Sequence, residues 1–336
     1  MKKITFIIPA YNAETTIRRT VLSIEELHVD SEILIVENGS MDNTRQVSDN
    51  LSREFCNIRV LTSEKGVSKA RNKGIEEATG QWIVFADADD ECIKGIAELN
   101  DFLDNSSVDL IIGGYKKDND PIIHEYGKRN VIIDVNDSVK AWMLVRPTLR
   151  MQAWAKVYRR EFLCENKLLF DETLSYSEDS EYVIRVLNKA RKIIITDKLF
   201  YQYHSGTTSA MRGFVQGRID AYIDALNAAE QDIVEESTKV KRAFADYIIA
   251  HINIIGVHDI FAYDIKDSWR SKCRKMSDLL SEDVLRRGIE NTSVRENPQA
   301  FPVMLCKYHF TCIGGMIYYV RSLQNRRRSQ MAREKE

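Results

Sequence analysis

Signals that would assign this 336-residue chain to several common protein classes are missing from its sequence. Its formal net charge is only −2, so the overall charge gives no reason to expect a nucleic-acid partner. The start, Met1 to Lys3, is followed by an apolar run that is too short for a signal peptide and has no cleavage site. The six cysteines form no CxxC pair and no His/Cys cluster with zinc spacing. Reduced, mostly buried thiols are therefore expected, in a cytoplasmic protein.

Two nucleotide-binding motifs are missing as well. No GxGxxG pattern follows the first apolar run, and no GxxxxGK[ST] pattern occurs anywhere in the chain. Both motifs place glycine-rich backbone against phosphates at the start of a helix. A dinucleotide-binding enzyme and a P-loop enzyme are therefore disfavoured.

Strand-like apolar runs are present, and they alternate with segments of helical periodicity. Residues 4–8, 32–36, 58–61 and 82–86 read as strands, and the segments between them read as helices. Alternation at this spacing predicts βαβ units and a Rossmann-like, mainly parallel sheet flanked by helices. The expected fold class is α/β.

The fourth apolar run ends in three carboxylates, Asp87, Asp89 and Asp90. Open α/β sheets bind their ligands at this end of the strands, where Asn12 and Glu37 also follow neighbouring strands. Such crowded like charges repel one another unless a cation gathers them, and Mg²⁺ or Mn²⁺ combines carboxylates with substrate phosphates. The pattern alone supports a metal–diphosphate site and a solvated acidic turn equally.

The chain changes character near its middle. Ser177 is placed to cap a helix that begins with Glu178 and Asp179. From about residue 213, strand patterns fade and helical periodicity continues. We expect an α/β domain over 1–209 and a helical C-terminal region with a basic tail over 210–336.

Six short motifs lie in one order across residues 4–209. They are Pro9-Ala10-Tyr11-Asn12, Val36-Glu37-Asn38-Gly39-Ser40 with Asp42-Asn43-Thr44, Gly66 with Ala70-Arg71-Asn72-Lys73-Gly74, Asp87-Ala88-Asp89-Asp90, the block of Trp154, Lys156 and Tyr158, and Glu178-Asp179. In this order and spacing the chain resembles the family 2 inverting glycosyltransferases, which have the GT-A fold. Each motif is weak alone, and the C-terminal third is outside the resemblance.

The resemblance implies that residues 1–115 bind a nucleotide sugar. At one position the chain departs from the family, which usually has Asp-Asp where this chain has Glu37-Asn38, so the first carboxylate is kept on a side chain one methylene longer. It implies a divalent metal, Mn²⁺ or Mg²⁺, held by Asp89 with Asp87 beside it. The donor-binding positions that it implies are Pro9, Ala10, Tyr11, Glu37, Arg71, Asp87, Ala88, His204 and Ser209.

The same resemblance implies that residues 116–209 hold the acceptor and the catalytic base. Asp179 would take the proton of the acceptor hydroxyl, and Glu178 would support it. Other interpretations stay open: Glu178 and Asp179 could only favour a helix N-terminus through its dipole. Arg71 could be a solvated helix residue, and His204 an ordinary loop histidine.

The C-terminal segment 301–320 is apolar except for Lys307, Tyr308 and His309, and residues 321–336 hold six basic side chains against two acidic ones. The central lysine argues against a membrane span. An aromatic apolar segment beside a basic cluster suits the anionic inner leaflet of the plasma membrane. A core helix followed by a solvated tail is the alternative.

The resulting hypothesis is a metal-assisted inverting glycosyltransferase that moves a sugar from a nucleotide diphosphate, a UDP-sugar, to a hydroxyl of a glycan or lipid-linked glycan. A nucleotidyltransferase is disfavoured because those enzymes have a Gly-rich basic loop after the first strand, where this chain has Pro9 to Glu14. A non-catalytic glycan-binding or scaffold protein with the same fold is the remaining alternative.

Overall fold

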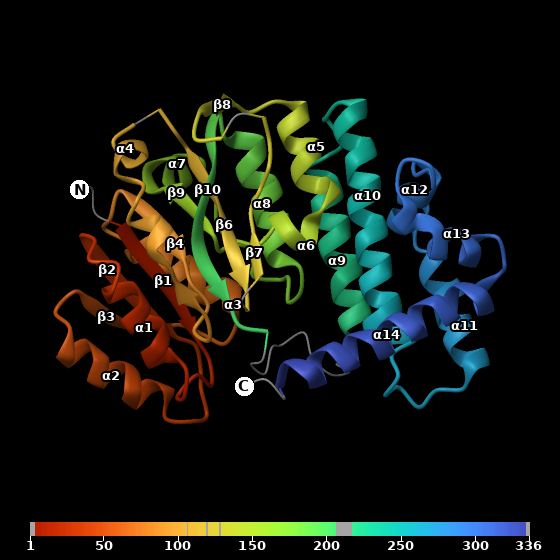
Figure 1. Ribbon diagram of the computed structural model, residues 1–336, viewed down its shortest axis with the longest axis horizontal. Helices are drawn as coiled ribbons and strands as arrows, with labels where there is room; N and C mark the ends of the chain where they lie inside the picture. The colour runs from red at the N-terminus through yellow and green to blue at the C-terminus, as the bar shows by residue number, and fades with distance from the viewer. Residues whose placement is uncertain (1–3, 106, 119, 128, 206–216, 334–336) are drawn as a thin grey trace. The chain divides into compact units, whose positions relative to one another are not determined.

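The computed structural model describes residues 4–105, 107–118, 120–127, 129–205 and 217–333 (Figure 1). The chain forms two compact units. The first contains Met1–Val135 and Gln152–Thr207, and the second contains Asn136–Met151 and Thr208–Glu336. The predicted limit between residues 209 and 210 lies outside the described residues. Residues 136–151 belong to the second unit, which the sequence did not indicate.

The first unit is built on one twisted sheet, in the order β3-β2-β1-β4-β9-β6-β10-β5. The first four of these strands are parallel, β9 runs antiparallel to both of its neighbours, and β6 is parallel to β10. Two short strands extend it, with β7 on β6 and β8 on β10. The α/β prediction is thus confirmed. The strands are β1 (Ile4–Ala10), β2 (Ser31–Glu37), β3 (Ile58–Thr62), β4 (Trp82–Phe85), β5 (Glu91–Cys92), β6 (Leu110–Lys117), β7 (Asp120–Ile122), β8 (Ile132–Asp134), β9 (Lys156–Arg159) and β10 (Lys192–Tyr203).

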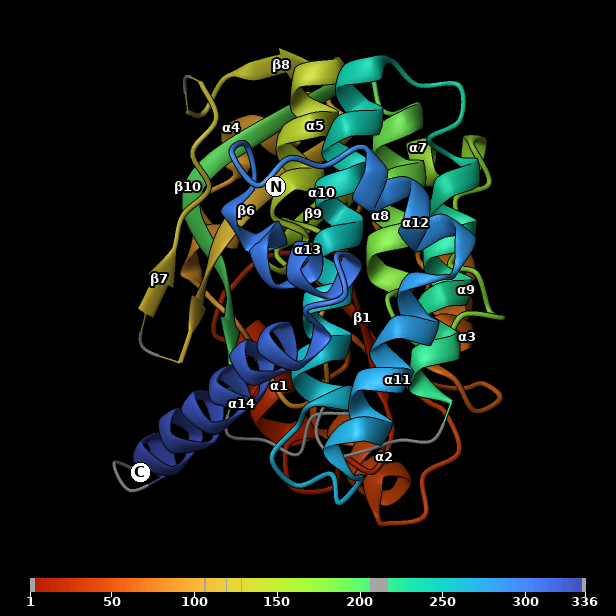
Figure 2. The same cartoon turned by 90° about the vertical axis from the view of Figure 1, so that its right-hand side faces the viewer.

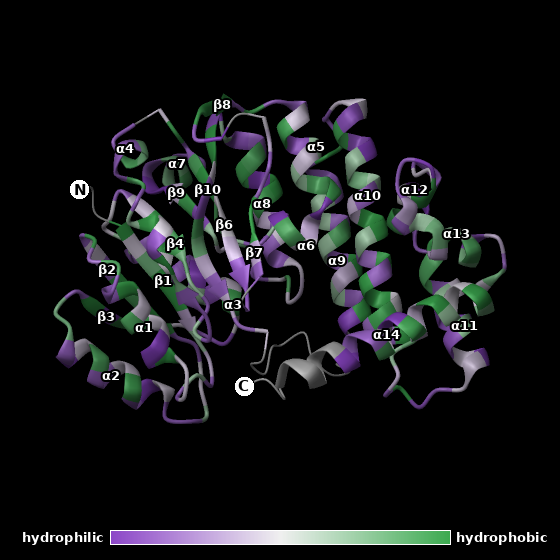
Figure 3. Ribbon diagram, in the orientation of Figure 1, coloured by the Kyte–Doolittle hydropathy of each residue, from purple (hydrophilic) through white to green (hydrophobic). Residues whose placement is uncertain are grey.

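Helices connect these strands, as the alternation of periods predicts. Figure 3 shows the apolar residues concentrated along β1 and β4, and every residue of both strands is buried. The helices of this unit are α1 (Ile17–Glu25), α2 (Thr44–Glu54), α3 (Val67–Glu77), η1 (Lys94–Ile96), α4 (Asn100–Leu103), α7 (Arg160–Glu165) and α8 (Glu178–Lys189). Between β5 and β6, η1 and α4 form two separate short turns.

Pro9 lies inside β1, although proline cannot donate a strand hydrogen bond. The carbonyl of Ile7 accepts from Ala86 N–H just beyond β4, whereas the carbonyl of Ala10 accepts from Asn38 N–H just beyond β2. Pro9 therefore faces the same side as Ile7, past the last residue of β4, where no N–H is required. This placement lets β1 continue to the site edge of the sheet.

Gly74 allows α3 to pack closely against β1. A Cβ atom at this position would lie 2.3 Å from Cγ2 of Ile7, which is far inside van der Waals contact. No side chain larger than hydrogen fits without moving the helix. The close approach fixes the part of α3 that carries Arg71, three residues earlier.

The second unit is helical in its described residues, in agreement with the periodicity from residue 213 onward. Helix α10 packs on α5 and α12, and α14 packs on α13 and α11, as Figure 2 shows. The apolar stretch 301–320 breaks after Lys307, and α14 begins at Thr311. None of the described helices is long and apolar enough to cross a bilayer. The helices are α5 (Asp137–Val145), α6 (Pro147–Arg150), α9 (Arg218–Gln231), α10 (Thr238–Ile255), η2 (Gly256–Ile260), α11 (Trp269–Leu280), α12 (Asp283–Glu290), η3 (Pro298–Ala300), α13 (Phe301–Lys307) and α14 (Thr311–Arg333).

Candidate active site

The turn after β4 directs its carboxylates in different directions. Asp90 is 1% exposed and points inward, where its Oδ2 accepts from the Tyr201 hydroxyl at 3.0 Å and its Oδ1 accepts from His204 N–H at 2.8 Å. The Tyr201 oxygen in turn accepts from the N–H of Asp87 at 2.9 Å. Burial, with the charge of Asp87 next, raises the pKa of Asp90 to about 8. Asp90 thus holds the turn together and leaves Asp87 and Asp89 for other roles.

Arg71 of α3 joins this turn to the start of α8. Its Nη2 donates to Asp87 Oδ1 at 3.2 Å, and its Nη1 donates to Asp179 Oδ1 at 2.5 Å and to Glu178 Oε1 at 3.2 Å. The guanidinium lies 5.1 Å from the centre of the Phe170 ring, and Arg71 is 3% exposed. One buried cation therefore faces three carboxylates, so the cluster keeps an excess of negative charge.

This excess of negative charge contributes to raised pKa values of two carboxyl groups in the cluster. Burial raises the pKa of Asp87 to about 6 although Arg71 opposes the shift, and Asp179 and Asp89 raise it further. Burial and the charge of Asp179 raise the pKa of Glu178 to about 7. Carboxyl groups with raised pKa values at the end of parallel strands are typical of functional sites.

The N-terminus of α8 presents Glu178 and Asp179 to Arg71. The predicted capping by the Ser177 side chain is wrong: Ser177 is the N-cap residue, but its φ is 60°, in the left-handed region, and its side chain makes no capping hydrogen bond. The second oxygen of Asp179 accepts from the N–H of Ala153 at 3.2 Å. Asp179 is therefore oriented by a guanidinium on one oxygen and by backbone on the other.

Lys156, in the Trp154 block, is a buried amine that interacts with the charge of Asp179. It is 1% exposed, and its Nζ donates to the backbone carbonyl of Gln152. Burial lowers the pKa of Lys156 to about 7, against the opposing effect of Asp179. The ring of Trp154 stacks on Tyr201 with centroids 4.6 Å apart. The block therefore contacts Tyr201 through Trp154 and interacts with Asp179 through Lys156.

The residues predicted to hold the nucleoside lie at the ends of β1 and β2. Pro9 and Ala10 are buried in β1, and the ring of Tyr11 is 39% exposed with Lys65 Nζ 4.8 Å from its centre. Glu37, at the end of β2, turns one carboxylate oxygen back to the N–H groups of Gly39 and Ser40. Its extra methylene is thus used to hold its own loop.

Of the remaining predicted donor-binding residues, two lie at or near the acidic turn and one lies outside the described residues. Ala88 is buried in the turn between Asp87 and Asp89. His204 follows β10, with Nε2 2.7 Å from Glu91 Oε1 and its backbone bound to Asp90. Ser209 lies outside the described residues. His204 is therefore connected to the acidic turn through two different acidic residues.

A divalent metal fits the donor set of the turn. Asp87 and Asp89 supply the carboxylate oxygens that Mg²⁺ and Mn²⁺ prefer, and the raised pKa of Asp87 marks negative charge that a cation would neutralise. Across the described part of the chain, no group of three or more His, Cys, Asp or Glu side chains is placed to hold a metal. A metal at Asp87 and Asp89 would therefore need further oxygen ligands, and substrate phosphates provide them.

Two structural contributors were not assigned a role from the sequence. Tyr201 bridges Asp87 and Asp90, but its position in an alternating strand carries no signal of that bond. Lys156 reads as a packing residue, and only its burial near Asp179 reveals an unusual cation.

Comparison with known proteins shows which family and fold the chain resembles. Residues 5–163 match the model of glycosyl transferase family 2. The uncharacterized glycosyltransferase EpsJ of Bacillus subtilis is 23% identical over 331 residues, which cover 92% of this chain and 93% of that protein. The crystal structure of TarS 1–349 from Staphylococcus aureus in complex with UDP-GlcNAc superposes with a TM-score of 0.68 at 18% identity, covering 98% of this chain and 92% of that one.

A second solved structure has the same fold at greater distance. The mannosyltransferase PcManGT from Pyrobaculum calidifontis, in complex with GDP-Man and Mn²⁺, has a TM-score of 0.54 at 14% identity and covers 95% of this chain and 87% of that one. The family match lies on the strands and turns that carry Arg71 and the acidic turn after β4. Residues 5–163 thus match glycosyl transferase family 2, and the chain has the GT-A fold.

Proposed function

We propose that the protein transfers a sugar, with inversion, from a UDP-sugar to a hydroxyl group of a glycan or lipid-linked glycan. The observation that carries this proposal is the guanidinium of Arg71, which contacts Asp87 after β4 and Asp179 at the start of α8. A donor-binding turn and a candidate proton acceptor thereby lie on either side of one buried cation. Inverting transfer requires both groups in one site.

Asp179 is the proposed general base. It takes the proton of the acceptor hydroxyl as that oxygen bonds to the anomeric carbon, and the bond from this carbon to the diphosphate oxygen breaks. The nucleoside diphosphate leaves on the opposite side, so one displacement inverts the configuration without a covalent enzyme intermediate. The bond from Ala153 N–H to Asp179 Oδ2 is long at 3.2 Å, and this oxygen is the one we assign to the acceptor.

Arg71 has a positioning role in this scheme. It holds Asp179 and Asp87 in fixed directions and compensates part of their charge. Its Nε–H is buried and has no hydrogen-bond partner among the described residues. Glu178 shares the same guanidinium and has a raised pKa of about 7, so it can hold a proton near Asp179 at neutral pH.

Asp89, with Asp87, is the proposed ligand set for a divalent metal. A bound Mn²⁺ or Mg²⁺ would stabilise the charge that develops on the leaving diphosphate. The similarity to the Mn²⁺ complex of the mannosyltransferase supports this assignment, and the similarity to the UDP-GlcNAc complex of TarS supports a UDP-sugar as donor. Tyr11, Glu37 and the ends of β1 and β2 are the proposed nucleoside side of the site.

The test is the Asp179→Asn variant, which keeps the shape of the side chain and removes its basicity. We expect the turnover number to fall roughly 10²–10⁴-fold, the usual contribution of a general base. Binding of the donor should persist. It is detected as a rise in melting temperature, because a ligand that binds only the native state stabilises that state. The measurement is product release from a panel of UDP-sugars with Mn²⁺, together with donor-induced thermal shifts.

The matched control is Asp49→Asn, in which an exposed carboxylate of α2, paired with Arg45, is changed in the same way. It should retain full turnover. Normal turnover by Asp179→Asn would refute Asp179 as the base. If the unaltered protein binds a UDP-sugar or glycan but releases no product with any donor, the protein is the non-catalytic glycan-binding alternative.

A further inference from the structure

The end of the second unit exposes a row of large apolar side chains. Six such residues of α13, α14 and their connection are about half exposed or more, although aromatic and aliphatic side chains of this size are usually buried. Their exposed fractions are Phe301 50%, Tyr308 64%, Phe310 56%, Ile313 51%, Met316 56% and Val320 49%.

Helix α14 has two different apolar faces. One face packs inside the second unit: a Cβ on Gly314 would lie 2.5 Å from Cys306 Sγ, and Tyr318 is fully buried. Ile313, Met316 and Val320 follow one another at intervals of three and four residues, so they form a stripe on another side of the helix. Packing within the chain therefore accounts for the first face and leaves the stripe exposed.

The same segment is strongly basic. Residues 301–333 contain six Lys or Arg residues and no Asp or Glu. Arg326 and Arg327 are exposed on α14, and among the described side chains neither forms an ion pair with a carboxylate. The Arg326 guanidinium lies 4.7 Å from the centre of the partly exposed Tyr263 ring. Arg327 lies seven residues beyond Val320, on the continuation of the stripe.

We propose that this surface, α13 and α14 with their connection, docks on an anionic lipid membrane. The apolar stripe would enter the boundary between head groups and acyl chains, and the arginines would contact anionic head groups. The helix lies on the surface and does not cross it, in agreement with the absence of a spanning helix among the described residues.

Charge complementarity favours a membrane over a second copy of the chain as the occupant. Two copies that meet through this surface would bring six basic side chains of each together without a carboxylate from either segment. Like charges across an interface oppose association. An anionic bilayer instead attracts each basic residue near its surface, and salt screens this attraction. This inference does not depend on the proposed transfer chemistry.

The test is co-sedimentation of the full chain with vesicles of phosphatidylcholine alone and of phosphatidylcholine mixed with phosphatidylserine. We expect binding to the anionic vesicles at least about tenfold tighter at low salt, with most of this preference lost when salt is raised. The first variant, Arg326→Glu with Arg327→Glu, should lose the preference for anionic vesicles. The second, Ile313→Ser with Met316→Ser and Val320→Ser, should weaken binding to them.

The matched control is Arg53→Glu with Arg242→Glu, which makes the same change of charge at exposed positions elsewhere and should bind like the unaltered chain. Circular dichroism checks that each variant is folded, and the arginine variant changes only exposed side chains. Equal binding to neutral and anionic vesicles would overturn the proposal, and so would normal binding by the arginine variant. Dimerisation that the serine variant abolishes, with no vesicle binding, would assign the surface to a second copy.

Discussion

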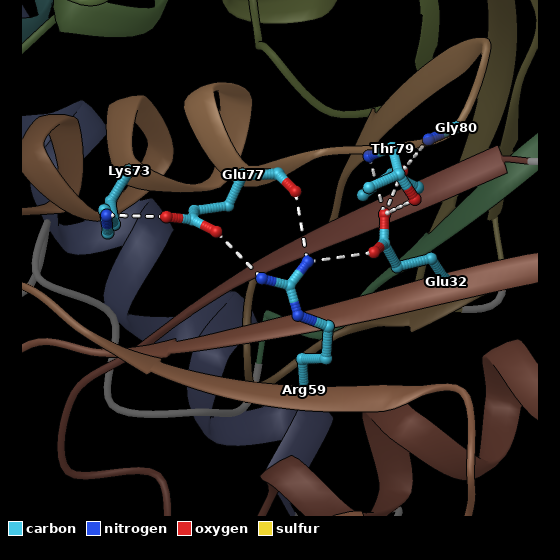
Figure 4. A network of polar contacts seen from close by, with 7 residues as sticks. Glu32, Arg59, Lys73, Glu77, Thr79 and Gly80 are labelled. Atoms are coloured by element: carbon cyan, nitrogen blue, oxygen red, sulfur yellow. Dashed lines mark hydrogen bonds and ion pairs between the residues drawn. The ribbon is translucent and has the colours of Figure 1, made fainter.

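Two buried carboxylate clusters lie at opposite ends of the parallel strands, and their charges are balanced in different ways. Figure 4 shows the first, around Glu32 near the start of β2, which accepts from Thr5 and Thr79 hydroxyls, from Thr79 N–H and from Arg59. Burial raises the pKa of Glu32, but these donors more than offset it and leave the pKa lowered. Arg59 also contacts Glu77, so the network continues to α3.

The second cluster, around Arg71, has the opposite balance. Three carboxylates share one guanidinium, and the pKa values of Asp87 and Glu178 are raised to about 6 and about 7. A carboxylate with enough donors stabilises the scaffold at neutral pH, whereas one with too few is poised to take a proton or a cation. The difference separates a structural network from a candidate active site in the same unit.

Among the variants that test this contrast, Arg71→Met should change the free energy of unfolding most. The change leaves three carboxylates without their cation, and loss of one partner from a buried ion pair typically destabilises a protein by about 3–5 kcal/mol. The loss should be greatest near pH 8 and smaller near pH 5, where the carboxyl groups can bind protons. Urea denaturation at the two pH values measures it.

One further variant tests whether charge or geometry matters at position 71, and a second variant at position 45 is its control. Arg71→Lys keeps the charge but not the planar fork, so its stability should lie between those of the other two proteins. Arg45→Met removes an exposed arginine paired with Asp49 and should change stability by less than about 1 kcal/mol. Equal, small effects of Arg71→Met and Arg45→Met would show that Arg71 does not balance the cluster.

Glu178→Gln and Glu32→Gln should change stability with opposite signs. The folded-state pKa of Glu178 is raised to about 7 from 4.5, so the folded protein binds the proton more tightly and loses stability as pH rises between these values. Gln removes this loss, and the variant should gain on the order of 1–3 kcal/mol above pH 7 and little at pH 4. Melting temperatures between pH 4 and pH 8, in EDTA, measure the gain.

For Glu32 the sign is reversed. Its folded-state pKa is lowered, so its contribution is present above the unfolded pKa and disappears as pH falls through the folded value. Glu32→Gln should therefore lose about 1 kcal/mol or more at pH 7, with the loss shrinking in acid. Parallel pH profiles for the two variants would contradict the contrast between the clusters.

The sheet edge of the candidate site could be predicted because strand period and strand ends are local properties. Asp87 and Glu37 follow buried runs in the sequence, and both strands end at the same edge in the structure. The start of α8 at Glu178 was also predictable from the helical pattern. The order of the motifs then indicated the family whose model matches residues 5–163.

The direction of each side chain was not predictable in the same way. The three contacts of Arg71 require α3, the turn after β4 and α8 to pack together, which no local pattern encodes. Glu37 has the residue type expected of a donor ligand, yet one of its oxygens binds its own loop. The close approach of α14 to α13, where Gly314 lies against Cys306, is likewise a packing contact that no local pattern encodes.

The last prediction concerns Tyr201, which links the acidic turn to β10. Tyr201→Phe removes the donor to Asp90 Oδ2 and the acceptor for Asp87 N–H, so it should reduce stability by about 1–3 kcal/mol and lower turnover by a smaller factor than Asp179→Asn. Tyr182→Phe is the control, because this fully buried tyrosine hydroxyl has no hydrogen-bond partner among the described residues. It should leave stability unchanged or slightly higher, since no bond is lost. If the two variants melt at the same temperature, the hydroxyl of Tyr201 does not hold the turn, and the balance of charges around Arg71 would have to position Asp87 without it.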